Sequence, residues 1–474
     1  MNNANNRSQL FSIITVLFFW GFIAASNGIL IPFCKGHFNL TQFQSQLIDF
    51  TFYGGYFIGS VILYLYSKFT GIELLNRIGF QKGIVYGLIV SAIGSLSIIP
   101  SVLSGSYILI LGSYFIIALG FSLQQTCAWP IIIALGSPET GAQRSNLAGS
   151  VFAIGTTIGP LILSFALFGS AEGNSAAVSL GSISYLYAGV TALFLLMAVF
   201  FSFAKLPLIR NEEHIEPGLG ALKYPQLVLG MVAIFIYVGV EVTIQSNLGA
   251  LLKLESFGSI VESELSPFIS LYWGSLMIGR WMGSVAVFGV KGRANSFLKI
   301  FVPYFAYTIV LLVIFIHGKD ASMLIPYVIP VALIIITHFL SGEKQTKMMV
   351  LFSLYGMLAM LVGLCTEGRI ALFAFLSGGL ACSVLWPCIF SLSIMGLGKY
   401  TSQGSAFLIM MILGGAIIPP LQGKLADLPS IGIHYSYFIP VLCFAYLAWF
   451  GMKVKSVLAS QGIHSDGLVI SGAH

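Results

Sequence analysis

Charged side chains are scarce in this sequence, because only 8% of its residues are Asp, Glu, Lys or Arg, whereas soluble domains contain about 25%. Hydrophobic residues make up 57% of the chain, and the mean hydropathy is +0.94. A water-soluble core cannot hide so many apolar side chains, and too few polar ones remain to cover a wet surface. The composition therefore excludes a soluble enzyme and indicates a protein whose solvent is the lipid bilayer.

Metal-ligating and catalytic patterns are also missing. The six cysteines include no Cys-x-x-Cys pair, and most of them lie within or at the ends of apolar segments, so neither a disulfide framework nor a zinc site is indicated. The sequence has no Ser/His/Asp, paired-His or Cys/His arrangement. We therefore expect no catalytic residue, no metal and no cofactor, and a protein that is not an enzyme. The cysteines are Cys34, Cys127, Cys365, Cys382, Cys388 and Cys443.

A concentrated basic tract is absent too, although the formal net charge is +6. The Lys and Arg residues stand singly in short polar segments, which argues against a nucleic-acid partner.

A cleaved signal peptide has to be considered, because the first apolar stretch follows Arg7 and passes Ala24, Ala25 and Ser26. That stretch, 10–32, is long for a signal peptide and many further apolar stretches follow, so we expect it to remain as the first span.

Apolar stretches of about 20 residues are abundant, and each is long enough to cross roughly 30 Å of hydrocarbon. Six of them precede a polar linker at 205–224 and eight follow it. We therefore predict an all-α integral membrane protein with about 14 transmembrane helices. The predicted spans are 10–34, 46–68, 82–101, 106–135, 147–170, 183–204, 225–248, 267–290, 296–316, 322–340, 348–366, 370–395, 404–422 and 436–457.

The basic residues divide unevenly between the two sides of the membrane. If the amino terminus is cytoplasmic, most of the 22 Lys and Arg residues lie on the cytoplasmic side, including Lys453 and Lys455 near the carboxyl end. Cytoplasmic loops carry such an excess by the positive-inside rule. We expect a multi-pass protein of the bacterial inner membrane with both termini in the cytoplasm.

An internal repeat relates the two parts of the chain. Trp129-Pro130 and Trp386-Pro387 are each followed, at a similar interval, by a segment rich in glycine and proline, 155–160 and 414–419. Two related halves with interrupted helices at these places are therefore predicted. The second half is longer by two spans, which fits two six-helix bundles plus an inserted two-helix hairpin. The predicted domains are 1–204 (first bundle), 205–224 (cytoplasmic linker), 225–457 (second bundle, with the hairpin at about 291–340) and 458–474 (cytoplasmic tail).

Interrupted helices at matching places in two halves indicate a central solute site, because the freed backbone groups need partners. Aromatic faces beside amides suit a sugar, whose C–H faces are apolar and whose hydroxyls need hydrogen bonds. Each residue also has a plainer alternative role, as packing at a kink, an interfacial anchor or an interhelical hydrogen-bond partner. The candidate substrate-binding residues are Asn27, Gln124, Gln125, Trp129, Gln245, Asn247 and Trp386.

Two acids are candidates for coupling transport to an ion. Glu241 lies near the middle of its span, where it either pairs with a cation such as Arg280 or takes up a proton. Asp49 is expected near the outer end of the second span, where a solvated carboxylate is the alternative. We expect Arg280 to give structural and electrostatic support, either by pairing with Glu241 or by reaching a membrane end.

Segments that span nearly the whole core carry a family resemblance. They are Phe18 to Trp20, Asn27 to Pro32, Phe52 to Ile58, Gln125 to Pro130, Arg144 to Ala148, Ile278 to Arg280 and Trp386 to Pro387. The chain resembles the sugar porters of the major facilitator superfamily that are related to bacterial fucose permease and the glucose/galactose transporters. The loop from Gly71 to Lys82 also resembles an inter-span loop of that superfamily, with Asn76 in place of an acid. The resemblance implies alternating access around a central site, usually with proton symport and in some relatives with sodium coupling.

The sequence departs from the resemblance at the residues that carry charge. The acids that fucose permease has in its first and fourth helices fall on Gly28 and Gln125, and two sugar-contacting amides of its fifth helix fall on Gly149 and Phe152. We expect other acids within the bundle to replace the missing carboxylates.

These observations predict a secondary active transporter that imports a monosaccharide such as fucose, glucose or galactose by alternating access, in symport with H+ or Na+. Its partners would be the sugar and the lipid bilayer, with no nucleic acid, and we expect a monomer. The alternatives are a carrier of another small polar solute, such as an amino sugar or a nucleoside, and a transport-inactive sugar sensor. The lost acids favour the sensor, and counterflow in vesicles distinguishes it from a carrier.

Overall fold

The computed structural model describes residues 3–70, 78–135, 141–168, 180–204, 206, 219–285, 292–342 and 344–463. In these ranges the chain forms helices and connections, with no strand. A helix satisfies the N–H and C=O groups of an apolar stretch internally, as hydrocarbon requires. Thirteen helical segments of the described chain are long and apolar enough to cross a membrane.

The six predicted spans before the linker each correspond to one long helix. These are α1 (Asn3–His37), α3 (Leu47–Thr70), α5 (Phe80–Leu103), α6 (Tyr107–Ala134), α7 (Gly141–Phe168) and α8 (Leu180–Phe203). A short helix, α2 (Gln42–Ser45), connects α1 to α3. The predicted loop from Gly71 to Lys82 lies mostly outside the described residues.

The eight predicted spans after the linker also have counterparts. Four are single helices, α9 (Pro225–Leu252), α10 (Ser266–Ser284), α11 (Arg293–Ile316) and α13 (Gln345–Cys365). The others combine shorter helices: η6 (Ser322–Tyr327) with α12 (Val328–Ser341), α14 (Gly368–Cys382) with α15 (Leu385–Ile394), α16 (Thr401–Met410) with η8 (Met411–Leu413) and α17 (Gly414–Ala426), and α18 (Gly432–Ser436) with α19 (Phe438–Ser460).

α10 is the predicted span that is absent from the thirteen apolar segments. Its 19 residues are enough to cross most of the hydrocarbon, but they include Arg280 and several serines. Ser270 and Ser275 are fully buried, since α10 packs against α7, α11 and α14. A helix that faces protein and not lipid tolerates such residues.

The expected helix interruptions are found in the second half only. α14 ends before Trp386, and a 3₁₀ turn separates α16 from α17. The expectation is wrong for the first half, because α6 and α7 continue through 129–130 and 155–160. A proline removes one backbone donor without having to end a membrane helix, provided that nearby groups compensate.

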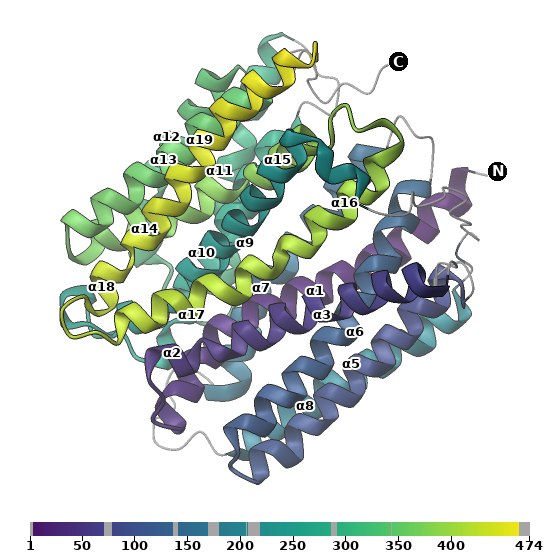
Figure 1. Cartoon of the computed structure of the whole chain (residues 1–474). Coiled ribbons are helices and arrows are strands. Elements are labelled where there is room, and N and C mark those ends of the chain that lie inside the picture. The colour runs from purple at the N-terminus through teal and green to yellow at the C-terminus, as the bar shows by residue number, and fades with distance from the viewer. Residues whose placement is uncertain are drawn as a thin grey trace.

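Figure 1 shows that α1 begins and α19 ends at the same end of the bundle, whereas α2 and α18 lie at the opposite end. We call the end that carries α2 the Gln42 end. The other end is the Gln226 end, where the side chain of Gln226 at the start of α9 donates to Gln461 after α19.

The helix pairing repeats between the two parts of the chain. α1 packs along α7 and α9 packs along α17, while α5 contacts α6 and α8 as α13 contacts α14 and α19. The two parts meet through α7 with α10 and through α3 with α17 (Figure 1). This pairing supports two related halves and leaves α11 and α12 without a counterpart in the first.

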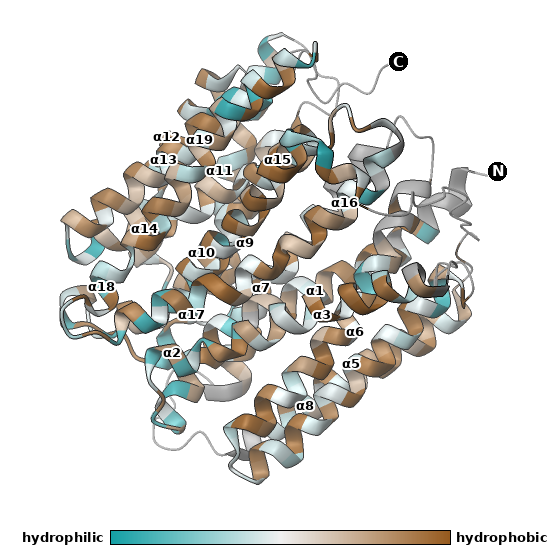
Figure 2. Cartoon of the chain, viewed as in Figure 1, coloured by the Kyte–Doolittle hydropathy of each residue, from teal (hydrophilic) through white to brown (hydrophobic). Residues whose placement is uncertain are grey.

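Glycines allow the paired helices to approach closely in both halves. A Cβ added to Gly155 of α7 would lie 2.1 Å from the carbonyl oxygen of Phe18, and one added to Gly414 of α17 would lie 1.7 Å from that of Phe235. Small residues are typical of such tight contacts in membranes. Figure 2 shows many hydrophobic residues along the long helices and hydrophilic ones around α2.

Candidate functional site

A buried amide and a buried acid form a pair between α1 and α3. The amide nitrogen Nδ2 of Asn27 donates to Oδ1 of Asp49 over 2.9 Å, and both side chains are 0% exposed. The remaining oxygens, Oδ1 of Asn27 and Oδ2 of Asp49, have no hydrogen-bond partner. The solvated alternative for Asp49 is therefore wrong. α2, α9 and α17 cover the Gln42 end, so a residue close to that end of its helix is still buried.

Two glutamines extend this buried polar group. Gln46, one turn before Asp49, donates through Nε2 to the carbonyl oxygen of Ser246 on α9 over 3.1 Å, while its Oε1 has no partner. Gln245 of α9 is 1% exposed, and neither of its amide atoms is hydrogen-bonded. It lies beside α1, because a Cβ on Gly28 would be 2.4 Å from its Oε1.

We call Asn27, Gln46, Asp49 and Gln245 the Asp49 cluster. Its free groups are mainly oxygens together with one amide nitrogen, which suits either sugar hydroxyls or a hard cation such as Na+. In the described ranges no group of three His, Cys, Asp or Glu side chains gathers that would hold a transition metal.

A second polar group surrounds Glu241 on α9. Its Oε1 accepts a hydrogen bond from the hydroxyl of Tyr237 over 2.8 Å and lies 3.6 Å from Nη2 of Arg280 on α10. The side chains of Arg280 and Glu241 are 22% and 13% exposed, so the pair is largely shielded. The ring of Trp386 lies 5.8 Å from that of Tyr237. The structure thus brings together the three predicted residues Glu241, Arg280 and Trp386.

One face of α9 joins the two groups. Tyr237, Glu241 and Gln245 follow one another at intervals of four residues, so they lie along the same side of the helix. Polar and charged side chains therefore extend along α9 from Tyr237 to the Asp49 cluster, between α1 of one half and α10 of the other.

Two predicted glutamines of α6 lie apart from this face. Gln124 accepts a hydrogen bond from the indole N–H of Trp20 over 2.9 Å and donates to the hydroxyl of Ser91 over 2.9 Å. Gln125 accepts a hydrogen bond from the hydroxyl of Tyr56 over 2.8 Å. All these partners belong to the first half, as expected of an interhelical hydrogen-bond role.

The last two candidate residues are Asn247 and Trp129. Oδ1 of Asn247 accepts from Nε2 of Gln42 over 2.8 Å, and its Nδ2 donates to the backbone of Thr243, so its amide is already engaged. Trp129 lies on α6, but its side chain is outside the described residues.

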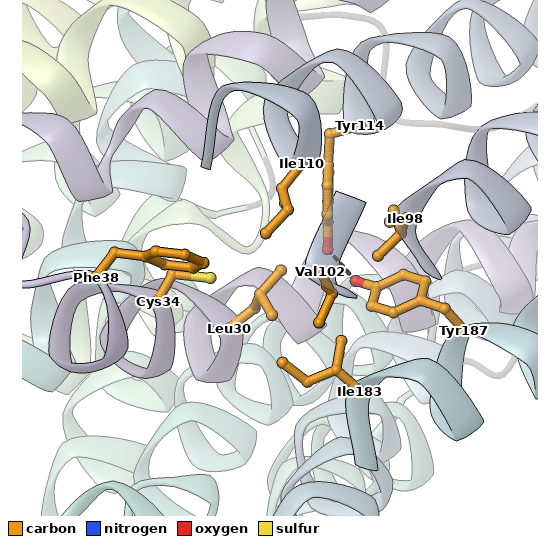
Figure 3. Close-up of a pocket in the computed structure, with 9 residues that line it drawn as sticks. All are labelled: Leu30, Cys34, Phe38, Ile98, Val102, Ile110, Tyr114, Ile183 and Tyr187. Atoms are coloured by element: carbon orange, nitrogen blue, oxygen red, sulfur yellow. Dashed lines mark hydrogen bonds between the residues drawn. The ribbon is translucent and has the colours of Figure 1, made fainter. Parts of the chain in front are cut away.

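A small cavity lies elsewhere, within the first half at the Gln42 end (Figure 3). Its only hydroxyl groups belong to Tyr114 and Tyr187, which hydrogen-bond to each other. No candidate residue lines it, and its apolar walls offer a sugar too few partners. The lining residues are Leu30, Cys34, Phe38, Ile98, Val102, Ile110, Tyr114, Ile183 and Tyr187.

Sequence reasoning missed Gln46 and Tyr237. Gln46 directly precedes α3 and lies three positions before Asp49, and Tyr237 lies four positions before Glu241 on the same face of α9. Helical spacing around each acid is the signal that could have found them.

Curated relatives resemble this chain over almost their whole length, although no protein-family model matches it. It is 33% identical to the glucose/galactose transporter of Brucella abortus biovar 1 (strain 9-941), over 93% of this chain and 92% of that protein. It is 30% identical to the putative glucose/galactose transporter of Helicobacter pylori (strain ATCC 700392 / 26695), over 96% of this chain and 98% of the relative.

A solved structure has a similar fold. The E. coli fucose:proton symporter, a major facilitator superfamily transporter, matches with a TM-score of 0.62 and 23% identity, over 94% of this chain and 98% of that one. These similarities confirm the resemblance and the all-helical fold class predicted from the sequence.

Proposed function

This chain belongs to the family of glucose/galactose transporters and has the major facilitator fold, and from this premise we propose that it is a cation-coupled symporter that imports a monosaccharide. It is a multi-pass membrane protein. Glucose, galactose and fucose are the first substrates to test, because the relatives are named for them. H+ and Na+ are the candidate coupling ions.

The observation that carries the proposal is the unsatisfied Asp49 cluster where the two halves meet. A buried polar group without a partner costs about 1–3 kcal/mol, and water cannot easily compensate for this inside a membrane. Gln245 alone has two unpartnered atoms and is 1% exposed. A sugar hydroxyl can both donate to its oxygen and accept from its nitrogen, which is the pairing that this amide lacks.

The face of α9 supports a division of roles. Gln245 and Asn27 bind the sugar hydroxyls, Asp49 carries the coupling cation, and Glu241 with Arg280 forms the charged end of the path. Trp386, beside Tyr237, offers an aromatic surface on which a sugar ring can stack. Gln124, Gln125 and Asn247 act as structural partners, because their amides are engaged within the protein.

Counterflow in proteoliposomes tests the proposal, with labelled glucose, galactose and fucose and with a pH or sodium gradient imposed separately. We expect Gln245→Ala to raise the KM for the transported sugar roughly tenfold, the equivalent of about 1.4 kcal/mol for a lost hydrogen bond. Gln226→Ala is the matched control, since that buried amide of α9 is paired with the backbone of Met395 and with Gln461. Its KM should stay unchanged.

Two results would overturn the proposed function, and a third would overturn its site. Absence of counterflow for all three sugars, with binding retained, would identify a sensor, whereas counterflow of only an amino sugar or a nucleoside would change the substrate class. An unchanged KM in Gln245→Ala would remove the assignment of the site.

A further inference from the structure

α2 closes the Gln42 end across the boundary between the two halves. This four-residue helix joins α1 to α3 but contacts α17 of the second half (Figure 1). Its own first turn is completed by Thr41 and Gln44, each of which accepts a backbone N–H from the other. These bonds hold α2 together as a compact unit, and its other polar groups can form hydrogen bonds with other elements.

Asp427, the first residue after α17, holds this unit from the opposite half. Its two carboxylate oxygens accept the backbone N–H groups of Gln42 and Phe43 over 2.7 and 2.9 Å. Hydrogen bonds to an ionised carboxylate are about twice as strong as those between neutral groups. α17 also approaches α2 closely, since a Cβ on Gly423 would lie 3.0 Å from the carbonyl oxygen of Gln42.

Side chains on and after α2 continue these contacts inward to α9. The amide of Gln42, which is 3% exposed, donates to Oδ1 of Asn247 over 2.8 Å and accepts from Nζ of Lys35 over 2.8 Å. Gln46 follows with its bond to the carbonyl oxygen of Ser246. Asp49 lies one turn further along, so α2 covers the Asp49 cluster from this end.

We propose that α2 is a gate over the Asp49 cluster and that Asp427 is the positioning residue that keeps it closed. The proposal rests on the proposed function, because a gate matters only if a solute reaches the cluster. Opening this end separates α2 from α9 and α17 and breaks the bonds of Asp427, Asn247 and Ser246 together. The bonds to Asp427 are the outermost, so their loss favours the open state while the cluster itself stays intact.

Cysteine accessibility tests the gate without relying on transport. Ser246→Cys is a suitable reporter, because Ser246 is 1% exposed, lies beside Asp49, and its hydroxyl donates to the carbonyl oxygen of Val242 on the same helix. The exposed native cysteine is removed as Cys365→Ser, and the other five are buried. A membrane-impermeant maleimide is then added to right-side-out and inside-out vesicles, and the labelling rate from each side is compared.

We expect Asp427→Ala to raise the labelling rate about fivefold to tenfold from the side of the Gln42 end only. Asp427→Asn should give a smaller increase, since it keeps an acceptor oxygen without the charge, and Asp427→Glu should restore part of the closure. Asp320→Ala is the matched control. That aspartate also accepts an N–H and an O–H group, but both belong to Ser322 of the same connection, so no change is expected.

The gate is rejected if Asp427→Ala leaves the labelling rate unchanged or raises it equally from both sides, which would show general loosening of the bundle. Thermal unfolding of each variant identifies such loosening directly. The labelling experiment tests the gate and the counterflow experiment tests the proposed function, so either one can be rejected without the other. A one-sided increase in labelling in a protein that moves no sugar supports the gate and rejects the proposed function, whereas normal counterflow with unchanged labelling rejects the gate alone.

Discussion

The two buried acids differ in whether a cation faces them. Glu241 lies 3.6 Å from the guanidinium of Arg280, whereas Asp49 has an amide partner and, in the described part of the chain, no ion pair. A carboxylate buried without a cation in a membrane is stable only when it binds a proton or a metal ion. Asp49, for which the sequence left a solvated position as the alternative, is thus the stronger candidate for coupling.

Asp49→Asn should therefore uncouple transport. The amide keeps the hydrogen-bonding shape of the site but cannot carry a proton or bind a cation as a carboxylate does. We expect accumulation of sugar against its gradient to fall at least about tenfold while counterflow, which needs no driving force, persists. Proteoliposomes with an imposed gradient of H+ or Na+ measure both. Normal accumulation by Asp49→Asn would exclude Asp49 as the coupling group.

Glu241→Gln serves as the comparison, because its main effect should be on stability. Removing one member of a shielded ion pair leaves Arg280 uncompensated, at a cost of roughly 1–3 kcal/mol, less than for a fully buried pair. The double variant Glu241→Gln with Arg280→Gln should recover most of this loss in thermal unfolding. Failure of the double variant to recover stability would mean that the two residues do not act as a pair.

At the scale of helices, the sequence predicts where the spans lie but not how some of them are broken. Apolar length determines that a helix crosses the membrane, and each predicted span has a counterpart within the described chain. α2 and the unbroken α7 could not be predicted this way, because they depend on contacts with other elements, such as Asp427 with Gln42. The burial of Asp49 escaped prediction for the same reason.

The contact between α1 and α7 can be tested through its glycines. Gly155→Ala places a Cβ 2.1 Å from the carbonyl oxygen of Phe18, and backbone cannot move aside as a side chain can. We expect a loss of about 1–3 kcal/mol or more in the free energy of unfolding. Gly189→Ala on α8 is the control, because no atom lies within 4 Å of its added Cβ. Equal unfolding temperatures for the two variants would show that the helices are not held this closely.

Across the whole molecule, the two halves meet along the same helices that carry the polar residues. α1 and α3 supply Asn27 and Asp49, α9 supplies Glu241 and Gln245, and α17 leads to Asp427. A rotation of one half against the other changes the surroundings of these side chains while leaving each bundle's own core packed. The Asp49 cluster therefore lies at the boundary between the halves that such a rotation would change.

This arrangement requires both ends of the chain to lie on one side of the membrane. α1 begins and α19 ends at the Gln226 end, and the excess of Lys and Arg favours the cytoplasm for that side (Figure 1). A reporter that is active only in the cytoplasm should be active when it is fused in the linker at 211 or after Ile463. A reporter that is active only outside the cytoplasm should be active when it is fused after Lys319. Lys319 donates to the carbonyl oxygen of Ser263, and Ser263 lies in the connection that follows the outer end of α9. If the fusions at 211 and after Ile463 report opposite sides, the number of membrane crossings between them is odd, and neither the two-bundle arrangement nor a gate formed by α2 can stand.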